Sequence, residues 1–231
     1  SVPVIRRPVV AIMATGDELV QPGEVPRPDQ IIASNGFALA ALAEVAGAEV
    51  RLLPIARDTA DSLRLGFSLA EGADVIVTIG GASVGDHDLV GPVARDMGFE
   101  QAFWKVAMRP GKPLMAGRLG GAILLGLPGN PVSAIVCAHL FLLPLLAHLQ
   151  GMPGGHDVRK ARLSVPLAAN GPRTHYMRAR LTPGDDGPTI APMDQQDSAL
   201  LSILTKADAL LIRPLGDGPV AAGETVEYLP I

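Results

Sequence analysis

The chain has 231 residues, which is enough for one large domain or two smaller ones with a substantial core. A formal net charge of −4 without a long basic run argues against a nucleic-acid-binding surface, and an aromatic content of 3% disfavours stacking platforms for single strands. The single cysteine, Cys137, excludes an intramolecular disulfide and a cysteine-based zinc site, and indicates a reducing compartment, which we take to be the cytoplasm.

Expected strands and helices alternate in the N-terminal part of the chain. Apolar, β-branched runs predict strands at 8–13, 49–55 and 75–79, and polar caps followed by helical spacing predict helices at 34–46 and 60–71. The run at 75–79 is apolar on both faces and is closed by two glycines. This pattern is typical of a strand buried on both sides, as in a parallel sheet.

The next part of the chain also combines expected strands and helices. We expect a helix at 90–97, strands at 101–108, 114–117 and 122–126, and a long apolar helix at 132–149. Asn130 as N-cap and Pro131 at the first helical position predict where the long helix begins. Pro144 lies in its interior and predicts a kink.

The long apolar helix has the length of a membrane span. It carries His139, His148 and Pro144 and has no basic flank, so we expect a buried core or dimer-interface helix rather than a span. Its two histidines are nine residues apart, which is no plausible metal-ligand spacing, and we expect them to be solvated or hydrogen-bonded.

A glycine- and proline-rich linker at 151–155 divides the chain into expected domains at 1–150 and 156–231. Beyond the linker the pattern changes to short extended segments separated by turn-forming residues. The expected strands are 162–167, 175–181, 189–191, 209–215 and 224–229. This pattern predicts a small β-barrel or sandwich.

Polar loops follow the expected strands of the first domain. They comprise Thr15-Gly16-Asp17-Glu18, Arg57-Asp58, 80–88, 109–112 and 128–131. In a parallel sheet such loops share one edge, where ligands bind. Carboxylates there would hold Mg²⁺ against a phosphorylated ligand, and Arg109 and Lys112 would neutralise its anionic oxygens. The 80–88 loop also fits an ordinary strand-to-helix turn, but matches neither a Rossmann nor a Walker A motif.

Five motifs, in order, carry a resemblance to a known family. They are Thr15-Gly16-Asp17-Glu18-Leu19, Gly80-Gly81-Ala82-Ser83-Val84-Gly85 with Asp88, Phe103-Trp104-Lys105, Arg109-Pro110-Gly111-Lys112-Pro113, and Gly126-Leu127-Pro128-Gly129-Asn130-Pro131-Val132-Ser133. Together they closely resemble the molybdopterin molybdenumtransferase family (MoeA and the gephyrin E-domain). The resemblance implies an α/β fold, a three-layer, mostly parallel MogA-like domain, followed by a small all-β barrel domain.

The resemblance also implies an activity and its site. Such enzymes take adenylylated molybdopterin and molybdate and release AMP in a Mg²⁺-dependent step. The implied catalytic residues are Glu18, Asp58 and Asp88, and the implied metal ligands are Glu18, Asp86 and Asp88. The implied ligand-binding residues are Thr15, Gly16, Asp17, Gly80, Gly81, Ser83, Gly85, Lys105, Arg109, Lys112, Pro128, Gly129, Asn130, Pro131 and Ser133.

Two departures qualify the resemblance. The family more often has Lys where Arg109 stands, and Arg keeps the charge but changes the geometry of an anion contact. In the second domain, Arg173, Arg178 and Ser198 lie near family positions that face the cleft.

The second departure is that family members also carry two N-terminal domains. We therefore expect a fragment or a short form that binds molybdopterin weakly and inserts little metal.

Two other functions remain open from the sequence. One is a molybdopterin adenylyltransferase-like enzyme, against which Ala82-Ser83 replaces the usual Thr-Gly and the second domain is unexplained. The other is a non-catalytic molybdopterin-binding or scaffold module. We expect a homodimer, and neither nucleic acid nor a membrane as a partner.

Overall fold

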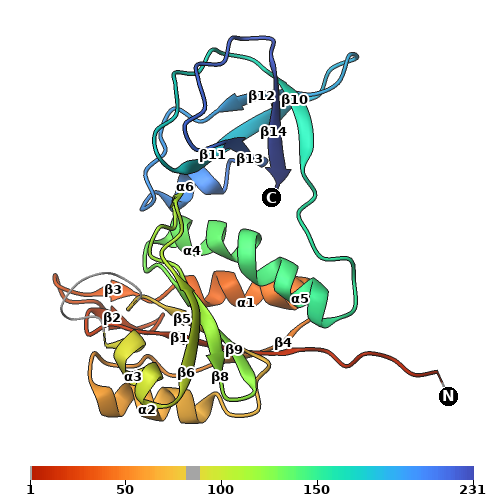
Figure 1. The fold of residues 1–231 in the computed structure, drawn as a ribbon. Helices are drawn as coiled ribbons and strands as arrows, with labels where there is room; N and C mark the ends of the chain where they lie inside the picture. The colour runs from red at the N-terminus through yellow and green to blue at the C-terminus, as the bar shows by residue number, and fades with distance from the viewer. Residues whose placement is uncertain (1, 82–88) are drawn as a thin grey trace.

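The computed structural model describes residues 2–81 and 89–231, and these form two regions, each built on a six-stranded sheet (Figure 1). The first sheet has, in spatial order, β4 (Glu49–Leu52), β1 (Val9–Ala14), β5 (Val75–Ile79), β9 (Ala122–Leu127), β8 (Met115–Leu119) and β6 (Phe99–Trp104). The first four strands are parallel, and β8 runs antiparallel to both of its neighbours. The predicted mostly parallel sheet is confirmed.

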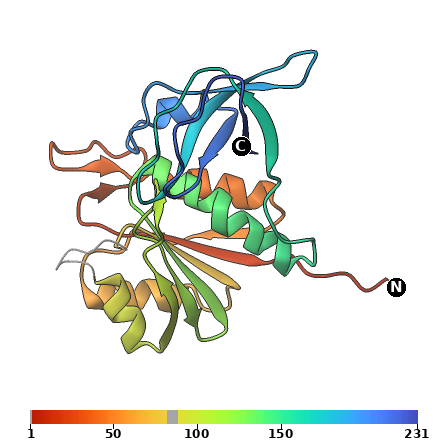
Figure 2. The same ribbon diagram turned by 45° about the horizontal axis from the view of Figure 1, so that its top comes forward.

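Helices cover both faces of this sheet (Figure 2). One face carries α1 (Asn35–Val45) and a continuous helical stretch of α4 (Pro131–Cys137), η1 (Ala138–Leu142) and α5 (Leu143–Leu149), and the other carries α2 (Ala60–Leu69) and α3 (Val90–Asp96). Alternate residues of β1 therefore enter different cores: Val10 and Ile12 pack under α1, whereas Ala11 and Met13 pack under α2. All five residues of β5 are buried, which confirms the three-layer arrangement.

The long apolar stretch contains a π-helical turn, η1, directly before Pro144. Proline has no N–H to donate to the preceding turn, and a wider turn accommodates that loss. By length and mean hydropathy (2.1) the stretch Pro131–Leu149 could cross a membrane, but 50% of it is buried inside the fold. Its packing against α1 and the first sheet is that of a core helix.

The second sheet closes into a small barrel. Its spatial order is β12 (Thr189–Pro192), β10 (Arg159–Leu163), β14 (Thr225–Pro230), β13 (Ala209–Arg213), β11 (Thr174–Thr182) and β7 (Met108–Arg109). An additional pairing between β12 and β11 completes the ring. The predicted small β domain is thus confirmed as a barrel, and a short helix, α6 (Leu201–Leu204), is an element that the sequence patterns did not predict.

One expected strand was wrong. The segment 101–108 is divided between β6, in the first sheet, and β7, which pairs in parallel with β11 of the barrel. Lys105 lies at the division with a left-handed φ of 64°, which ends an extended run. A short parallel pair, β2 (Leu19–Val20) and β3 (Ile31–Ile32), flanks the irregular proline-rich stretch.

Candidate functional site

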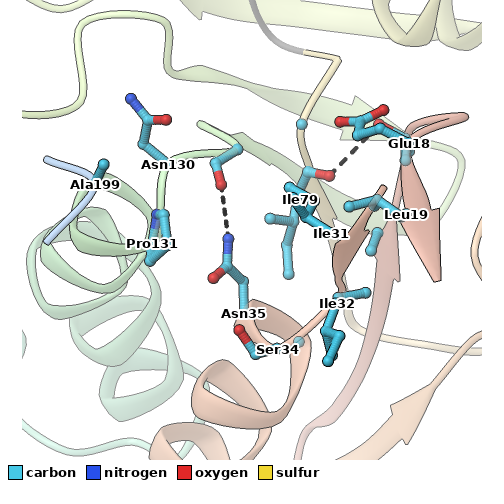
Figure 3. Close-up of a pocket in the computed structure, with 16 residues that line it drawn as sticks. Glu18, Leu19, Ile31, Ile32, Ser34, Asn35, Ile79, Asn130, Pro131 and Ala199 are labelled. Atoms are coloured by element: carbon cyan, nitrogen blue, oxygen red, sulfur yellow. Dashed lines mark hydrogen bonds between the residues drawn. The ribbon is translucent and has the colours of Figure 1, made fainter. Parts of the chain in front are cut away.

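A cleft of about 520 Å³ opens at the carboxyl edge of the first sheet (Figure 3). Its walls come from the ends of β1, β5 and β9, the short β2–β3 pair, the starts of α1 and α4, and one residue of the second region. The lining residues are Ala14, Thr15, Glu18, Leu19, Ile31, Ile32, Ala33, Ser34, Asn35, Gly36, Ile79, Gly80, Gly129, Asn130, Pro131 and Ala199. The loops that were expected to converge do so after β1, β5 and β9.

Backbone hydrogen bonds hold these strand ends together. Thr15 N donates to the Ile79 carbonyl at 2.9 Å, and Gly80 N donates to the Leu127 carbonyl at 3.0 Å. Gly80 has a φ of 88°, and a Cβ there would lie 2.8 Å from the Thr15 carbonyl oxygen. Only glycine fits this close approach, so Gly80 allows the ends of β1 and β5 to come together, and its ligand contact stays a prediction.

The acidic loop after β1 sends one carboxylate into the cleft. Glu18 lines the cleft, and its carboxylate lies over Gly16, where any Cβ would clash with it. Asp17 instead supports the neighbouring loop: its Oδ1 accepts a hydrogen bond from Asp58 N at 3.2 Å. Asp58 is exposed and does not line the cleft. Glu18 is therefore the acidic residue that the described structure brings to the site.

Two asparagines close the cleft from the helix starts. Asn35 Nδ2 donates to the Gly129 carbonyl at 2.7 Å (Figure 3), and Asn130 Nδ2 donates to Ser198 Oγ at 3.1 Å. The predicted helix start is confirmed, with Asn130 as the N-cap of α4 and Pro131 at its first position, but the Asn130 side chain makes no capping hydrogen bond and its amide contacts Ser198 instead. Asn35, the first residue of α1, was not among the expected site residues, and no local pattern indicates that it lines the cleft.

A group of four arginines and one histidine lies around the pairing of β7 with β11, and its members are Arg109, Arg173, Arg178, Arg213 and His175. Arg178 is fully buried, its Nη2 donates to the Asp197 carbonyl at 3.3 Å, and its Nε and Nη1 have no hydrogen-bond partner among the described residues. Burial lowers the pKa of Arg178, and nearby Arg109 lowers it further, whereas Asp197 raises it. Unpaired N–H groups on a buried guanidinium cost stability, and an anion drawn to this positive charge would offset that cost.

His175 and Arg213 belong to the same group, and sequence patterns did not indicate either. Arg109 Nη2 lies 2.6 Å from His175 Nδ1, and Arg213 pairs with Asp217 at 2.8 Å. Burial is the largest influence on His175 and, together with the surrounding arginines, it lowers the pKa of His175 to about 3. The group therefore carries an excess of positive charge.

The two predicted lysine contacts lie elsewhere. Lys105 and Lys112 line a more open cavity of about 560 Å³ with Arg173, and neither lines the main cleft. Lys105 Nζ lies 4.0 Å from the centre of the Trp104 ring, a cation–π distance. These residues present a second positively charged surface next to the arginine group.

The remaining predicted residues divide into buried and undescribed ones. Pro128 and Ser133 are buried and shape the loop before α4 without lining the cleft, and Gly81 packs against Val90. The predictions for Ser83, Gly85, Asp86 and Asp88 lie outside the described residues. Within residues 2–81 and 89–231, no group of three or more metal-ligating side chains is close enough to hold a metal ion. The Mg²⁺ site stays a prediction, as do the homodimer, the cytoplasmic location and the absence of a membrane partner.

Comparison with known proteins accounts for both regions. Residues 11–148 match the family model described as a probable molybdopterin binding domain, and residues 160–231 match the MoeA C-terminal region (domain IV). The second match accounts for the barrel, which an adenylyltransferase-like enzyme left unexplained.

Curated relatives and a solved structure agree with these matches. The chain is 33% identical over 230 residues to a Staphylococcus aureus protein and 36% identical over 237 residues to a Nostoc protein, each named molybdopterin molybdenumtransferase. These alignments cover 99% and 100% of this chain but 55% and 54% of the relatives, so the chain spans about half of their length.

The crystal structure of a molybdopterin biosynthesis MoeA protein from Pyrococcus horikoshii superposes with a TM-score of 0.83 at 30% identity, covering 97% of this chain and 55% of that one. Along almost its whole length, this chain thus shares three features with a MoeA protein: the mixed sheet, the barrel and the order of the two matched regions. The chain belongs to the MoeA (molybdopterin molybdenumtransferase) family and comprises its molybdopterin-binding domain and its C-terminal region.

Proposed function

We propose that this chain provides the substrate-binding part of a molybdopterin molybdenumtransferase. It would bind adenylylated molybdopterin in the cleft and molybdate beside it, for insertion of molybdenum with release of AMP. The observation that carries the proposal is the contact between the cleft and the arginine group: Asn130 of the cleft binds Ser198, and Ser198 follows Asp197, whose carbonyl binds the buried Arg178. A ligand-sized cleft and an anion contact are thereby joined through one short segment.

The chemistry of the lining supports a pterin carrying an anion. Ile31, Ile32 and Ile79 give the cleft an apolar wall suited to a flat ring, and Asn35 and Asn130 supply polar groups at its rim. Arg178 and Arg109 would neutralise a tetrahedral oxyanion. These are the two kinds of contact that the proposed pair of substrates requires.

Magnesium fits the cleft in part. Glu18 is a hard oxygen donor of the kind that Mg²⁺ prefers, and Asp86 and Asp88 would complete its ligands. When bound, Mg²⁺ would neutralise phosphate oxygens of the adenylylated substrate and stabilise the departing AMP. Glu18 is the described acidic residue that would hold the ion, since it lines the cleft.

The test is binding of adenylylated molybdopterin to the intact chain, measured by equilibrium dialysis with and without Mg²⁺. We expect saturable binding that Mg²⁺ strengthens, together with little molybdenum insertion by this chain alone. Glu18→Gln should abolish the strengthening by Mg²⁺, a loss of at least about tenfold in affinity or about 1.4 kcal/mol. Glu24→Gln, an exposed acid of the same segment that does not line the cleft, is the matched control.

Absence of saturable binding to a correctly folded chain would contradict the proposal. Equal Mg²⁺ dependence in the Glu18→Gln variant and the parent would remove Glu18 from the metal site. Asp88→Ala separates the enzyme from the non-catalytic scaffold. If the chain is an enzyme, the parent inserts measurable molybdenum and the variant does not. If it is a scaffold, the parent itself has no insertion activity.

A further inference from the structure

Arg109 and His175 face each other across the junction of the two regions. β7 and β11 are parallel neighbours, and their register places Arg109 opposite His175. Arg109 Nη2 lies 2.6 Å from His175 Nδ1, a short hydrogen-bond distance. His175 is buried, with 3% of its surface exposed, whereas Arg109 is exposed. An imidazole of β11 thus holds a guanidinium of β7, the short strand that follows β6 along the chain.

The chemistry of the two groups fixes which one donates. A guanidinium has N–H groups only and is always charged, so Nδ1 of His175 accepts and its ring proton lies on Nε2. Arg173, Arg178 and Arg213 stand near the ring and disfavour a second positive charge there. The nearby carboxylates, Asp217 and Asp197, lie against Arg213 and Arg178 respectively. His175 is therefore a neutral acceptor at neutral pH.

A neutral acceptor differs from a carboxylate in one decisive respect. A carboxylate opposite Arg109 would orient the guanidinium equally well but would cancel its charge, and so weaken its attraction for an anion. A neutral imidazole orients the guanidinium and leaves the charge available. The side chain of Arg109 has many rotamers. Without a partner to hold it, the free energy of anion binding would be reduced by the entropic cost of ordering that side chain.

We propose that His175 is a positioning residue that aims the Arg109 guanidinium at the oxyanion substrate while leaving its charge uncancelled. This inference rests on the proposed function, since it assigns a positioning role at the proposed oxyanion site, which is joined to the cleft through Ser198 and Asp197. The ligand class is a tetrahedral oxyanion of the molybdate type. Arg178, buried near the ring with no partner for its Nε and Nη1 among the described residues, adds positive charge behind that site.

Three substitutions separate positioning from a structural role, with molybdate as the titrated probe in calorimetry on the intact chain. His175→Phe keeps the ring volume without an acceptor, and should weaken molybdate binding at least about tenfold. His175→Asn keeps an acceptor near the Nδ1 position without charge, and should restore affinity to within about threefold of the parent. His175→Asp keeps an acceptor but adds a negative charge.

The aspartate variant is the sharpest of the three. A purely structural role predicts that His175→Asp raises the melting temperature, because the new carboxylate would lie among arginines. It also predicts that molybdate affinity is unchanged. Positioning without cancellation predicts the same gain in stability but a weaker molybdate affinity, by about tenfold or more. Unchanged affinity in the phenylalanine and aspartate variants, both folded, would overturn the inference, as would a parent chain that binds no molybdate.

Failure of the proposed function can be told apart from failure of this inference. Molybdate binding with the expected variant pattern, but without binding of adenylylated molybdopterin, would leave His175 in its role and refute the larger proposal. Binding of adenylylated molybdopterin, with no effect of His175→Phe on molybdate affinity, would support the proposed function and refute the role of His175. Asn35→Ala, at the other end of the cleft, is a control that should alter pterin binding and leave molybdate affinity unchanged.

Discussion

Individual residues in this fold carry charge in places where water is excluded. Arg178 is fully buried with two unsatisfied nitrogens, and His175 is buried beside it and three other arginines. Burying such groups costs stability unless they are paired, so the fold bears that cost at the position where an anion would repay it. If the proposed anion binds there, it should stabilise the fold as well as occupy the site.

The buried histidine makes stability depend on pH in a defined window. Its folded pKa is lowered to about 3 from an ordinary value near 6.5. Between these values the unfolded chain binds a proton that the folded chain does not, so stability falls as pH falls below about 6.5. From pH 7 to pH 5 the loss from His175 should be about 2 kcal/mol.

Urea unfolding at pH 7 and pH 5 measures this effect. His175→Phe should remove most of the difference between the two pH values. His139, whose pKa is also lowered by burial, contributes the same sign and remains in both proteins, so comparison with the parent isolates His175. His148→Gln, at an exposed position, should keep the full difference. An unchanged difference in His175→Phe would show that the ring is not buried in neutral form.

Single elements show how one residue type decides a strand pairing. Gly117 of β8 lies opposite Gln101, where β6 contains a bulge, and a Cβ there would clash with the Glu100 carbonyl and lie 2.6 Å from the Phe99 ring. The β6–β8 contact is therefore possible only with glycine at this position. The same strand pair ends at Lys105, whose left-handed backbone turns the chain toward the barrel.

Gly117→Ala should destabilise the protein by about 1–3 kcal/mol through overpacking against backbone that cannot move away. Gly121→Ala, in the adjoining turn where a Cβ meets nothing within 4 Å, should change stability by less than about 0.5 kcal/mol. Chemical denaturation of both variants measures the contrast. Equal stabilities would mean that β6 and β8 separate more easily than their register indicates.

At the scale of the whole molecule, the two regions share one hydrophobic core. The core under α1 and α4 includes Leu204, Leu210 and Leu229 of the barrel region. Strand β7 adds backbone pairing to that shared packing, and Val132 N donates to the Ser198 carbonyl at 3.1 Å. Proteins whose regions share a core tend to unfold together, so we expect one cooperative transition.

Leu210→Ala tests this coupling. Removing a fully buried side chain should cost about 2–5 kcal/mol, and should shift the Trp104 fluorescence transition and the far-UV circular dichroism transition together. Leu215→Ala is the matched control, because Leu215 is 56% exposed and its loss should shift neither transition by more than about 0.5 kcal/mol. Trp104 lies in the first region, so a fluorescence transition unaffected by Leu210→Ala would show independent unfolding.

Local patterns in the sequence determined most elements of the fold and their order. The buried run of β5, the alternation of β1 and the turn-rich barrel strands each follow from apolar spacing, which depends on near neighbours only. The cleft at the carboxyl edge was also predictable, because parallel strands bring their loops to one side. Gly80 and Glu18 lie there as expected.

Tertiary structure alone decided which polar residues meet. The partners Asn130 and Ser198 are 68 residues apart, and Arg109 and His175 are 66 apart, so no local spacing could indicate either contact. The same reason explains why one expected strand became β6 and β7: its second half pairs with a strand that lies far along the chain. Local chemistry determined the elements and their caps, whereas long-range packing decided which side chains bind across the junction and which arginine is left with unpaired nitrogens.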